Sequence, residues 1–419
     1  MYALLDQVLD RVVKRGALII TDCEGRPHSY GDGSGEAVRF RIADRATAVK
    51  LALDPDFYLG EAYMDGGIVL ERGSIYDLLA LLLENIRGRH EWPWAMKLLE
   101  RSRRAVRRIH QFNGLRRAKQ NVTHHYDLSG ELYDLFLDRD RQYSCAYFDH
   151  PGASLDEAQL AKKRHLAAKL AIEPGMRVLD IGSGWGGLGL YLAETCGAKV
   201  VGVTLSEEQH KLSNERAHQR GVADRVEFRL LDYRQLEEPF DRIVSVGMFE
   251  HVGIGYYAQF FSKCRQLLKD DGVGVLHSIN RSRGPGSTSA WINKYIFPGG
   301  YIPALSEVLP AMECSGLYVT DIEILRLHYA ETLRGWSERF HANRDKVKDI
   351  YDERFCRMWE FYLAASETSF RFGGMNNFQI QFARNQHALP MTRNYMLEEE
   401  ERLREIDQKR PRLKSVSAE

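Results

Sequence analysis

Short apolar runs alternate with stretches of helical spacing through the second half of the chain. We expect strands over residues 177–181, 199–205, 226–231, 240–248, 272–279, 318–325 and 378–382. Helices are expected over residues 155–170, as an amphipathic helix, over 206–221, with Ser206 as its N-cap, and over 256–268 and 347–370. Because parallel strands need a crossover connection, this order predicts an α/β fold with a seven-stranded, mostly parallel sheet.

The first part of the chain has a different pattern. An amphipathic helix is expected over residues 1–16, strands over 17–21 and 38–42, and an apolar helix over 75–86. These elements predict a small N-terminal α+β domain. We therefore expect four parts: this domain at 1–90, a basic linker at 91–120, a larger domain at 121–395, and a charged C-terminal tail at 396–419 that frays.

A glycine-rich turn, VLDIGSGWGG at residues 178–187, follows the first strand of the predicted sheet. Gly182, Gly184 and Gly186 carry no side chain where the backbone would pass close to a ligand, and the helix that follows offers unpaired N–H groups. A nucleotide-like ligand fits such a turn. The alternative is a tight strand-to-helix loop of the kind found in any α/β enzyme.

The ends of the next two strands favour one nucleotide over another. A dinucleotide-binding fold places an acid at the end of the second strand, where this chain has Thr204. The third strand is followed by Asp232 and Tyr233, an acid and an aromatic residue suited to an adenine. The missing acid argues against NAD, and S-adenosylmethionine becomes the leading cofactor.

Composition argues against several other classes of protein. Lysine plus arginine and aspartate plus glutamate both number 58, so no net charge attracts the chain to nucleic acid. The six cysteines have no paired or metal-like spacing, which indicates reduced thiols without disulfides or a metal site. No run is long enough to span a bilayer. We expect a cytoplasmic protein.

A local basic segment interrupts this balance at residues 97–119, where nine Lys or Arg residues stand against one Glu. Apolar residues interleave with them, so a helix here could lie on an anionic membrane surface. A solvated helix linking two domains is an equal alternative. Nucleic-acid binding is a weaker third one, since no recognised binding module is present.

Polar residues also stand at the ends of the fourth and fifth strands. Glu250 and His277 would lie at the carboxyl edge of the sheet, where open α/β folds bind their ligands. As alternatives, Glu250 and His251 cap the next helix and His277 is a core residue. An aromatic-rich insertion at 281–305 suggests a lid or an apolar substrate wall, with a packed loop as the alternative.

Six motifs in order resemble one enzyme family between about residues 121 and 386. They are QYSCAYF (142–148), VLDIGSGWGG (178–187), GVTLSEEQ (202–209), MFEHVG (248–253), LHSI (276–279) and HYAETLRGW (328–336). They are similar to the cyclopropane-fatty-acyl-phospholipid synthases and mycolic acid cyclopropane synthases, which are class I S-adenosylmethionine-dependent methyltransferases with a Rossmann-like sheet. The N-terminal third resembles the extra domain of the bacterial phospholipid enzymes, which implies a role in lipid handling.

The resemblance implies specific site residues and no metal. Those at the cofactor are Tyr143, Ser144, Asp180, Gly182, Gly184, Gly186, Thr204, Leu205, Gln209, Asp232 and Tyr233. Within this set, Tyr143 and Ser144 would contact the methionine end of the cofactor, and Thr204 and Gln209 the ribose. The catalytic pocket, which holds bicarbonate in this family, would consist of Cys145, Glu250, His277, Ile279 and Tyr329. Spacing identifies no His or Asp partner that would make Cys145 a nucleophile.

The implied reaction transfers a methyl group from S-adenosylmethionine to the cis double bond of an acyl chain of a membrane phospholipid. A cyclopropane ring then forms through a carbocation that bound bicarbonate deprotonates. The enzyme would associate peripherally with the inner face of the membrane, and a homodimer is left open. One alternative is a methyl-branched or methylene product on the same fold, and a second is a non-catalytic lipid-binding protein.

Overall fold

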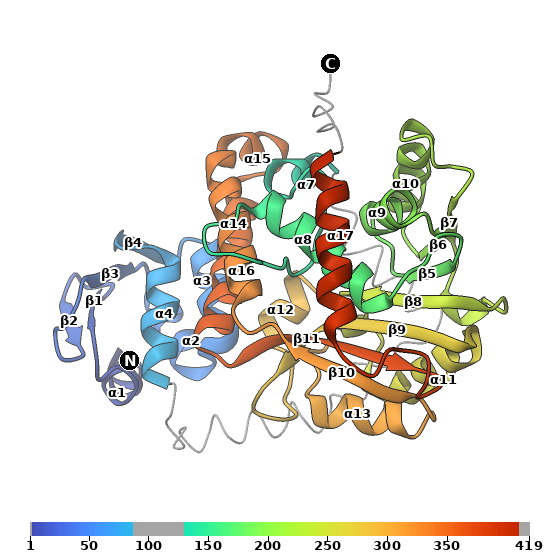
Figure 1. Ribbon diagram of the computed structural model, residues 1–419. Coiled ribbons are helices and arrows are strands. Elements are labelled where there is room, and N and C mark those ends of the chain that lie inside the picture. The colour runs from blue at the N-terminus through green and yellow to red at the C-terminus, as the bar shows by residue number, and fades with distance from the viewer. Residues whose placement is uncertain (1, 87–129, 410–419) are drawn as a thin grey trace. The chain divides into compact units, whose positions relative to one another are not determined.

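The computed structural model describes residues 2–86 and 130–409 (Figure 1). They divide into two compact units. The first contains residues 1–107, 287–298 and 333–375, and the second contains 108–286, 299–332 and 376–419. The first unit thus includes two segments from the range 121–395, which the sequence suggested as one domain. The basic segment 97–119 lies outside the described residues.

The first unit is built around a four-stranded sheet of order β2-β1-β3-β4. Its strands are β1 (Ala17–Thr21), β2 (Pro27–Tyr30), β3 (Ala37–Ile42) and β4 (Ile68–Arg72), of which only β1 and β3 pair in parallel. Its helices are α1 (Tyr2–Val12), α2 (Arg45–Leu53), α3 (Pro55–Met64), α4 (Ile75–Ile86), α12 (Ala290–Tyr295), α15 (Arg344–Ile350) and α16 (Glu353–Arg371). The predicted α+β character of the N-terminal part is confirmed.

Helix α12 brings part of the aromatic insertion into the core of the first unit. Trp291 is 1% exposed, and its ring centroid lies 4.6 Å from that of Phe361. A Cβ atom on Gly60 would lie 2.4 Å from Trp291 Nε1, so the glycine makes room for the indole. The packed-loop interpretation therefore applies to Trp291.

The single helix predicted over 347–370 is wrong. The chain forms α15 and α16, separated at Tyr351 and Asp352. Asp352 is extended and its side chain accepts a hydrogen bond from Phe355 N at 2.6 Å, which caps the start of α16.

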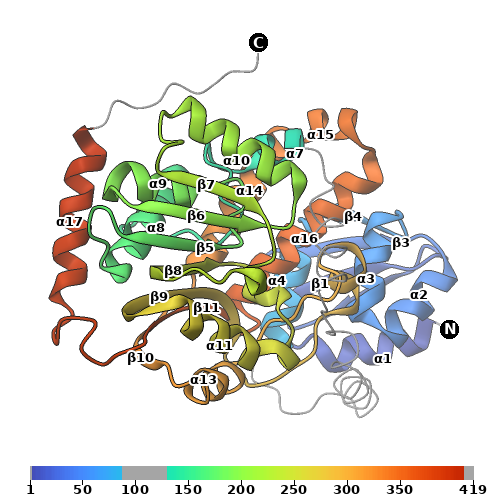
Figure 2. The same cartoon turned by 90° about the vertical axis from the view of Figure 1, so that its right-hand side faces the viewer.

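The second unit contains a seven-stranded sheet of order β10-β11-β9-β8-β5-β6-β7 (Figure 2). Its strands are β5 (Arg177–Ile181), β6 (Lys199–Thr204), β7 (Val226–Leu230), β8 (Phe240–Val246), β9 (Leu268–Arg281), β10 (Tyr318–Ile324) and β11 (Met375–Ala383). Strands β7, β6, β5, β8 and β9 pair in parallel, and β10 pairs antiparallel with β11. The predicted seven-stranded, mostly parallel sheet is confirmed, although β9 and β11 extend beyond the expected bounds.

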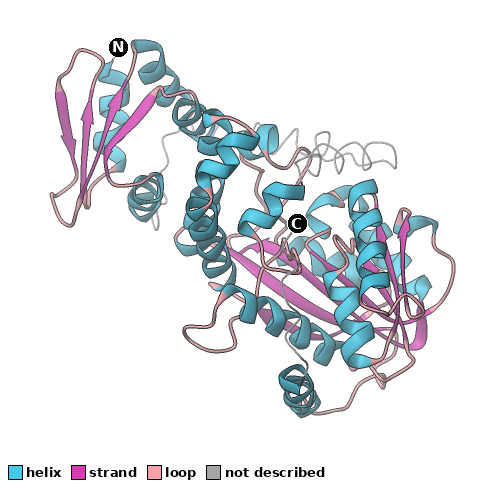
Figure 3. Ribbon diagram, turned by 90° about the horizontal axis from the view of Figure 1, so that it is seen from above, coloured by secondary structure: helices cyan, strands magenta, loops and turns pink. Residues whose placement is uncertain are grey.

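Helices connect these strands (Figure 3). The helices of this unit are α7 (Gly130–Phe136), α8 (Leu155–Leu170), α9 (Gly187–Cys196), α10 (Glu207–Gln219), α11 (Tyr257–Leu267), α13 (Leu305–Glu313) and α17 (Asn394–Lys409), with short 3₁₀ turns that include η1 (Tyr233–Gln235) and η2 (Phe249–His251). Helix α14 (His328–Ala342) begins in this unit, and its residues from 333 onward belong to the first unit. The side chain of Ser206 accepts from Gln209 N and caps α10, as expected. None of the helices in the described part of the chain is long and apolar enough to cross a bilayer.

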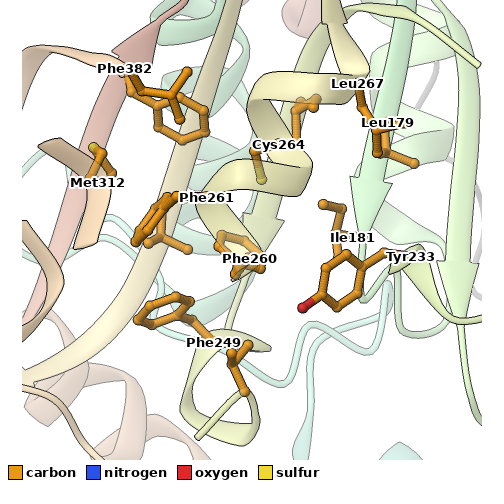
Figure 4. Packing of buried hydrophobic residues seen from close by; sticks show 14 of the residues in the cluster. Leu179, Ile181, Tyr233, Phe249, Phe260, Phe261, Cys264, Leu267, Met312 and Phe382 are labelled. Carbon is orange, nitrogen blue, oxygen red and sulfur yellow. The ribbon is translucent and has the colours of Figure 1, made fainter. Parts of the chain in front are cut away.

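Alternating residues of the parallel strands face two different hydrophobic layers. Leu179 and Ile181 of β5 belong to a cluster with residues of α11 and α13, and Figure 4 shows part of this cluster, including aromatic side chains from α11, η1, η2 and β11. Val178 of the same strand packs on the opposite face with α8, α9 and α17. The sheet is therefore buried on both faces, which explains its continuous apolar runs.

The C-terminal helix α17 belongs to this second layer. Its Leu403 is 0% exposed and packs in the same cluster as α8 and α9. The expectation that the C-terminal tail frays is therefore wrong for its residues up to 409. Residues 410–419 lie outside the described part.

Helix α8 departs from the expected amphipathic pattern because its cationic side chains are buried. Each of four such side chains meets carboxylates that come from other parts of the chain. The pairs are Lys163 with Asp140, Arg164 with Asp149 and Asp407, His165 with Glu323 and Glu400, and Lys169 with Glu323. The buried charges of α8 are thus compensated by tertiary partners, which helical periodicity cannot reveal.

Candidate functional site

A cavity opens where β5, β6, β7 and β8 end, at the carboxyl edge of the parallel strands. Every predicted cofactor residue lines it except Gly186. They are Tyr143, Ser144, Asp180, Gly182, Gly184, Thr204, Leu205, Gln209, Asp232 and Tyr233. The lining also includes Gln142, Trp185, Arg234, Met248 and His251, which sequence analysis did not assign.

The glycines of the turn have different roles. Gly182 has φ +82°, and a Cβ atom there would lie 2.7 Å from Met248 Cβ. Gly184 has φ +55° and open space where a Cβ would be. A Cβ on Gly186 would instead lie 2.6 Å from the Phe228 ring. The first two keep the cavity floor free of side chains, and Gly186 allows close packing at the start of α9.

Asp180 presents a buried carboxylate to the cavity. The residue is 2% exposed, and its Oδ2 atom has no hydrogen-bond partner among residues 2–86 and 130–409. Burial raises the pKa of Asp180 to about 7, although the charge of Lys162 partly opposes this rise. Such an oxygen is suited to accept a hydrogen bond from a cationic ligand group.

The polar residues at the other strand ends are held by local partners. The Thr204 hydroxyl donates to Gln209 Oε1 at 2.8 Å. This hydrogen bond holds together the two polar side chains that β6 and α10 place at the cavity. Arg234 donates to both oxygens of Asp232, through Nε at 2.8 Å and Nη2 at 2.7 Å. Arg234 follows Asp232 by two residues, and this spacing was the only feature of the sequence that could have indicated the ion pair.

Glu250 begins a second polar group close to the same edge of the sheet. It lies in η2 after β8 and is 8% exposed. Ile279 N on β9 donates to Glu250 Oε1 at 2.7 Å. Glu250 Oε2 has no hydrogen-bond partner in the described residues, and the nearby Ser278 hydroxyl donates to Ile279 O at 3.2 Å. Burial raises the pKa of Glu250, and the Ile279 N–H partly offsets this.

His277 lies on β9 and is 1% exposed. Its Nδ1 lies 3.2 Å from Gln379 Nε2, and its Nε2 lies 3.4 Å from Asn377 Nδ2. Burial holds the pKa of His277 well below its usual value, so the imidazole is neutral and carries a single N–H. It accepts from one of the two amide N–H groups. The side-chain oxygens of Asn377 and Gln379 have no hydrogen-bond partner in the described residues, so an amide turned over about its last bond would accept from the ring N–H.

Sequence analysis missed the two amides that flank His277. Asn377, Gln379 and Gln381 alternate with apolar residues along β11, and all three are buried. This alternation was visible in the sequence, but the buried polar positions became meaningful only once β11 was placed next to β9.

The other predicted catalytic residues lie on neighbouring segments. Cys145 is 1% exposed, and its thiol donates to Ala146 O at 3.3 Å. Burial raises the pKa of this thiol far above its usual value, which disfavours the thiolate needed for nucleophilic attack. Tyr329 is 8% exposed in the first turn of α14, whose Thr332 hydroxyl accepts from Ala146 N at 3.0 Å. The structure thus joins the segment around Cys145 to α14.

Comparison with known sequences shows the family to which the chain belongs. The family model of mycolic acid cyclopropane synthetases matches residues 113–380. A probable fatty acid methyltransferase of Pseudomonas putida is 38% identical over 349 residues, which cover 81% of this chain and 86% of the relative. The cyclopropane-fatty-acyl-phospholipid synthase of Escherichia coli K12 is 38% identical over 343 residues, which cover 79% of this chain and 86% of the relative.

Solved structures of two relatives are similar to this chain over 63% of its length. The cyclopropane synthase MmaA2 from Mycobacterium tuberculosis has a TM-score of 0.60 at 33% identity, covering 63% of this chain and 98% of that structure. The mycolic acid cyclopropane synthase CmaA1, complexed with SAH and CTAB, has a TM-score of 0.60 at 35% identity, covering 63% and 97%.

Proposed function

Since the chain belongs to the mycolic acid cyclopropane synthetase family and is an S-adenosylmethionine-dependent methyltransferase, we propose that its substrate is an unsaturated acyl chain of a membrane phospholipid. The product would be a cyclopropane ring in place of the cis double bond. The observation that carries this proposal is the cavity, whose lining matches the predicted cofactor residues at every position but one.

The residues present fit S-adenosylmethionine, which supplies a methyl group as an electrophile when bound. Gly182 and Gly184 leave room for the ligand, and Asp180 Oδ2 would accept from its ammonium group. The joined Thr204 and Gln209 side chains would bind the ribose hydroxyls. Fixed polar groups of this kind orient a ligand without reorganisation during the reaction.

Methyl transfer to a double bond leaves a positive charge on the acyl chain, and ring closure requires loss of a proton. We assign Glu250 the role of stabilising that charge, because a buried carboxylate acts strongly in a site that excludes water. Its Oε2, which has no hydrogen-bond partner within residues 2–86 and 130–409, would accept the O–H of bicarbonate, and bicarbonate would supply the base for the proton. His277 already meets Asn377 and Gln379, so a donor role for His277 would require one of those contacts to be replaced.

A product assay tests the proposal. The protein is incubated with labelled S-adenosylmethionine and vesicles of phospholipids with defined cis double bonds, and the recovered acyl chains are analysed by mass, fragmentation and proton spectra. We expect a cyclopropane chain. No label in the lipid, together with a thermal shift from NAD and none from S-adenosylhomocysteine, would contradict the proposal.

The methyl-branched alternative is kept because of the relatives themselves. A tuberculostearic acid methyltransferase of Mycobacterium tuberculosis is 39% identical over 275 residues, although these cover only 64% of that relative. A saturated methyl branch differs in mass from a cyclopropane, whereas a methylene product is an isomer. Mass alone therefore identifies the first, and the spectra separate the second.

We also propose that segment 97–119 brings the enzyme to anionic membranes, on the strength of its cationic and apolar residues. Binding to vesicles with and without anionic lipid, at low and high salt, measures this contribution. Equal binding to both vesicles would support the linker interpretation instead.

A further inference from the structure

Helix α8 supports the wall of the cavity at Ser144 through two side chains. Gln159 Nε2 donates to Ser144 O at 3.0 Å, and Lys162 Nζ donates to Ser144 Oγ at 2.8 Å. Gln159 and Lys162 are three residues apart, hence on one face of the helix, and both are 0% exposed. Both the backbone and the side chain of Ser144 are therefore fixed from behind the cavity.

The contact with Lys162 also sets the direction of the Ser144 hydroxyl. An ammonium group only donates, whereas a hydroxyl has one hydrogen and two lone pairs. Because Ser144 Oγ accepts from Lys162, its own hydrogen points away from the lysine. Ser144 lines the cavity, so this hydrogen is available to an acceptor bound there. A carboxylate is the acceptor that such a charge-supported donor favours most.

Lys162 differs from the other buried cations of α8. Lys163, Arg164, His165 and Lys169 each lie within salt-bridge distance of a carboxylate. For Lys162, no carboxylate lies within that distance anywhere in the described residues, and its hydrogen-bond partner is the neutral Ser144. A buried cation with no carboxylate at salt-bridge distance in the described residues is costly to fold and leaves a positive potential behind the cavity wall, which also acts on the Asp180 carboxyl group in that wall. An anionic ligand group in the cavity would compensate it.

The charges around Lys162 agree with this geometry. Burial lowers the pKa of Lys162 to about 7, and the surrounding carboxyl groups of Asp138 and Asp140 only partly oppose the effect. Asp140 is already paired with Lys163, Arg216 and Arg220. A ligand carboxylate near Ser144 would favour the charged form of Lys162 and so strengthen the contact that orients the hydroxyl.

We propose that Lys162 is a positioning residue that makes this end of the cavity selective for the carboxylate of the cofactor's amino-acid part. It acts through Ser144, whose hydroxyl it turns into the cavity, and through its positive charge. This inference rests on the proposed function, namely that the cavity binds S-adenosylmethionine. The inference adds a residue that determines which ligand binds, although Lys162 lies behind the cavity wall and does not itself line the cavity.

Two ligands that differ only at the amino-acid end test the proposal. S-adenosylhomocysteine carries the carboxylate, and 5′-methylthioadenosine has the same nucleoside and sulfur without it. In calorimetric titrations of the full chain, Lys162→Met should weaken S-adenosylhomocysteine by at least roughly tenfold, the size of one hydrogen bond to a charged group. The affinity for 5′-methylthioadenosine should not change. KM for S-adenosylmethionine should rise more than kcat falls.

Lys169→Met is the matched control, because Lys169 is another buried lysine two helical turns further along α8 and touches no cavity residue. It should leave the ratio of the two affinities unchanged. Ser144→Ala should reproduce the selective loss, and adding Lys162→Met to it should cost less than Lys162→Met alone. Ser144→Ala also carries the test if Lys162→Met does not fold.

The outcomes separate the two proposals. An unchanged affinity for S-adenosylhomocysteine in Lys162→Met, or an equal loss for both ligands, would overturn the positioning role of Lys162. If the wild-type protein bound neither ligand, the proposed cofactor itself would be wrong.

Discussion

Replacement of Glu250 by Gln tests whether this buried carboxylate acts through its charge. Ile279 N donates to Oε1 at 2.7 Å, so a Gln side chain would keep its oxygen toward that N–H. Its NH₂ group would then occupy the position of Oε2, which has no partner in the described residues. The substitution therefore removes the negative charge and places a donor where we propose an acceptor.

The expected loss is large for the reaction. Removal of one fixed electrostatic group that stabilises transition-state charge costs about 2.7–4 kcal/mol, which corresponds to roughly 10²–10³ in kcat. The affinity for S-adenosylhomocysteine should stay near that of the wild type, because Glu250 does not line the cofactor cavity.

Stability should change in the opposite direction. Burial raises the pKa of Glu250 in the folded protein, so the folded state binds this proton more readily than the unfolded chain does. The free energy of unfolding therefore falls as pH rises from the ordinary glutamate pKa through the raised value, and stays lower above it. Gln does not titrate and avoids that penalty. At neutral pH, the Tm of Glu250→Gln should equal or exceed that of the wild type.

The assay combines initial rates on phospholipid vesicles, calorimetric binding of S-adenosylhomocysteine, and thermal unfolding from pH 4 to pH 8. Glu367→Gln is a suitable control, since Glu367 is also a buried glutamate but lies in the first unit, where it pairs with Arg371. It should keep its kcat. The reasoning fails if Glu250→Gln retains most of the wild-type rate, or if its defect is a loss of cofactor binding.

Four further changes have defined outcomes. Gly182→Ala places a Cβ 2.7 Å from Met248 at φ +82°, so it should weaken S-adenosylhomocysteine binding measured by calorimetry, through a strain of about 1–3 kcal/mol; wild-type affinity would argue against the close approach. Cys145→Ser should keep most activity, whereas a trapped lipid adduct on Cys145 in the wild type would contradict our assignment. Leu403→Ala should lower the free energy of unfolding by about 2–5 kcal/mol in urea titrations, and a change below 1 kcal/mol would mean that α17 contributes little. Charge reversal of the arginines in 103–108 should reduce binding to anionic liposomes and reduce activity together, and undiminished binding would favour a linker role.

The parts of the fold that could be predicted from sequence are those with strong local signals. The strand from Arg177 to Ile181 follows a Pro-Gly breaker and precedes the glycine turn, and Ser206 caps its helix as expected. Thr204 in place of an acid, together with Asp232 and Tyr233 after the next strand, similarly favoured S-adenosylmethionine over NAD. Each of these signals lies within a few residues of the feature that it specifies.

The features that sequence analysis missed depend on distant partners. Helix α8 was expected to be amphipathic, but its Lys169 is buried and pairs with Glu323 of β10. The C-terminal residues looked like a fraying tail, but Leu403 and Asp407 are partly or fully covered by contacts with α8 and α9. His277 was expected in the catalytic pocket, and the amides of β11 that flank it there were not foreseen. No local pattern encodes such pairings.

The dependence of α8 on α17 has a consequence for synthesis of the protein. Arg164 and His165, in the middle of α8, receive Asp407 and Glu400 as partners from the last helix of the described chain. The ribosome makes α8 long before it makes these acids. During that time the cations that α8 will bury lack some of their counter-ions. Because such charges oppose burial until they are paired, α8 cannot settle behind Ser144 early. The cavity is therefore completed only after α17 has been made, and a nascent chain stalled before residue 394 should not retain S-adenosylhomocysteine.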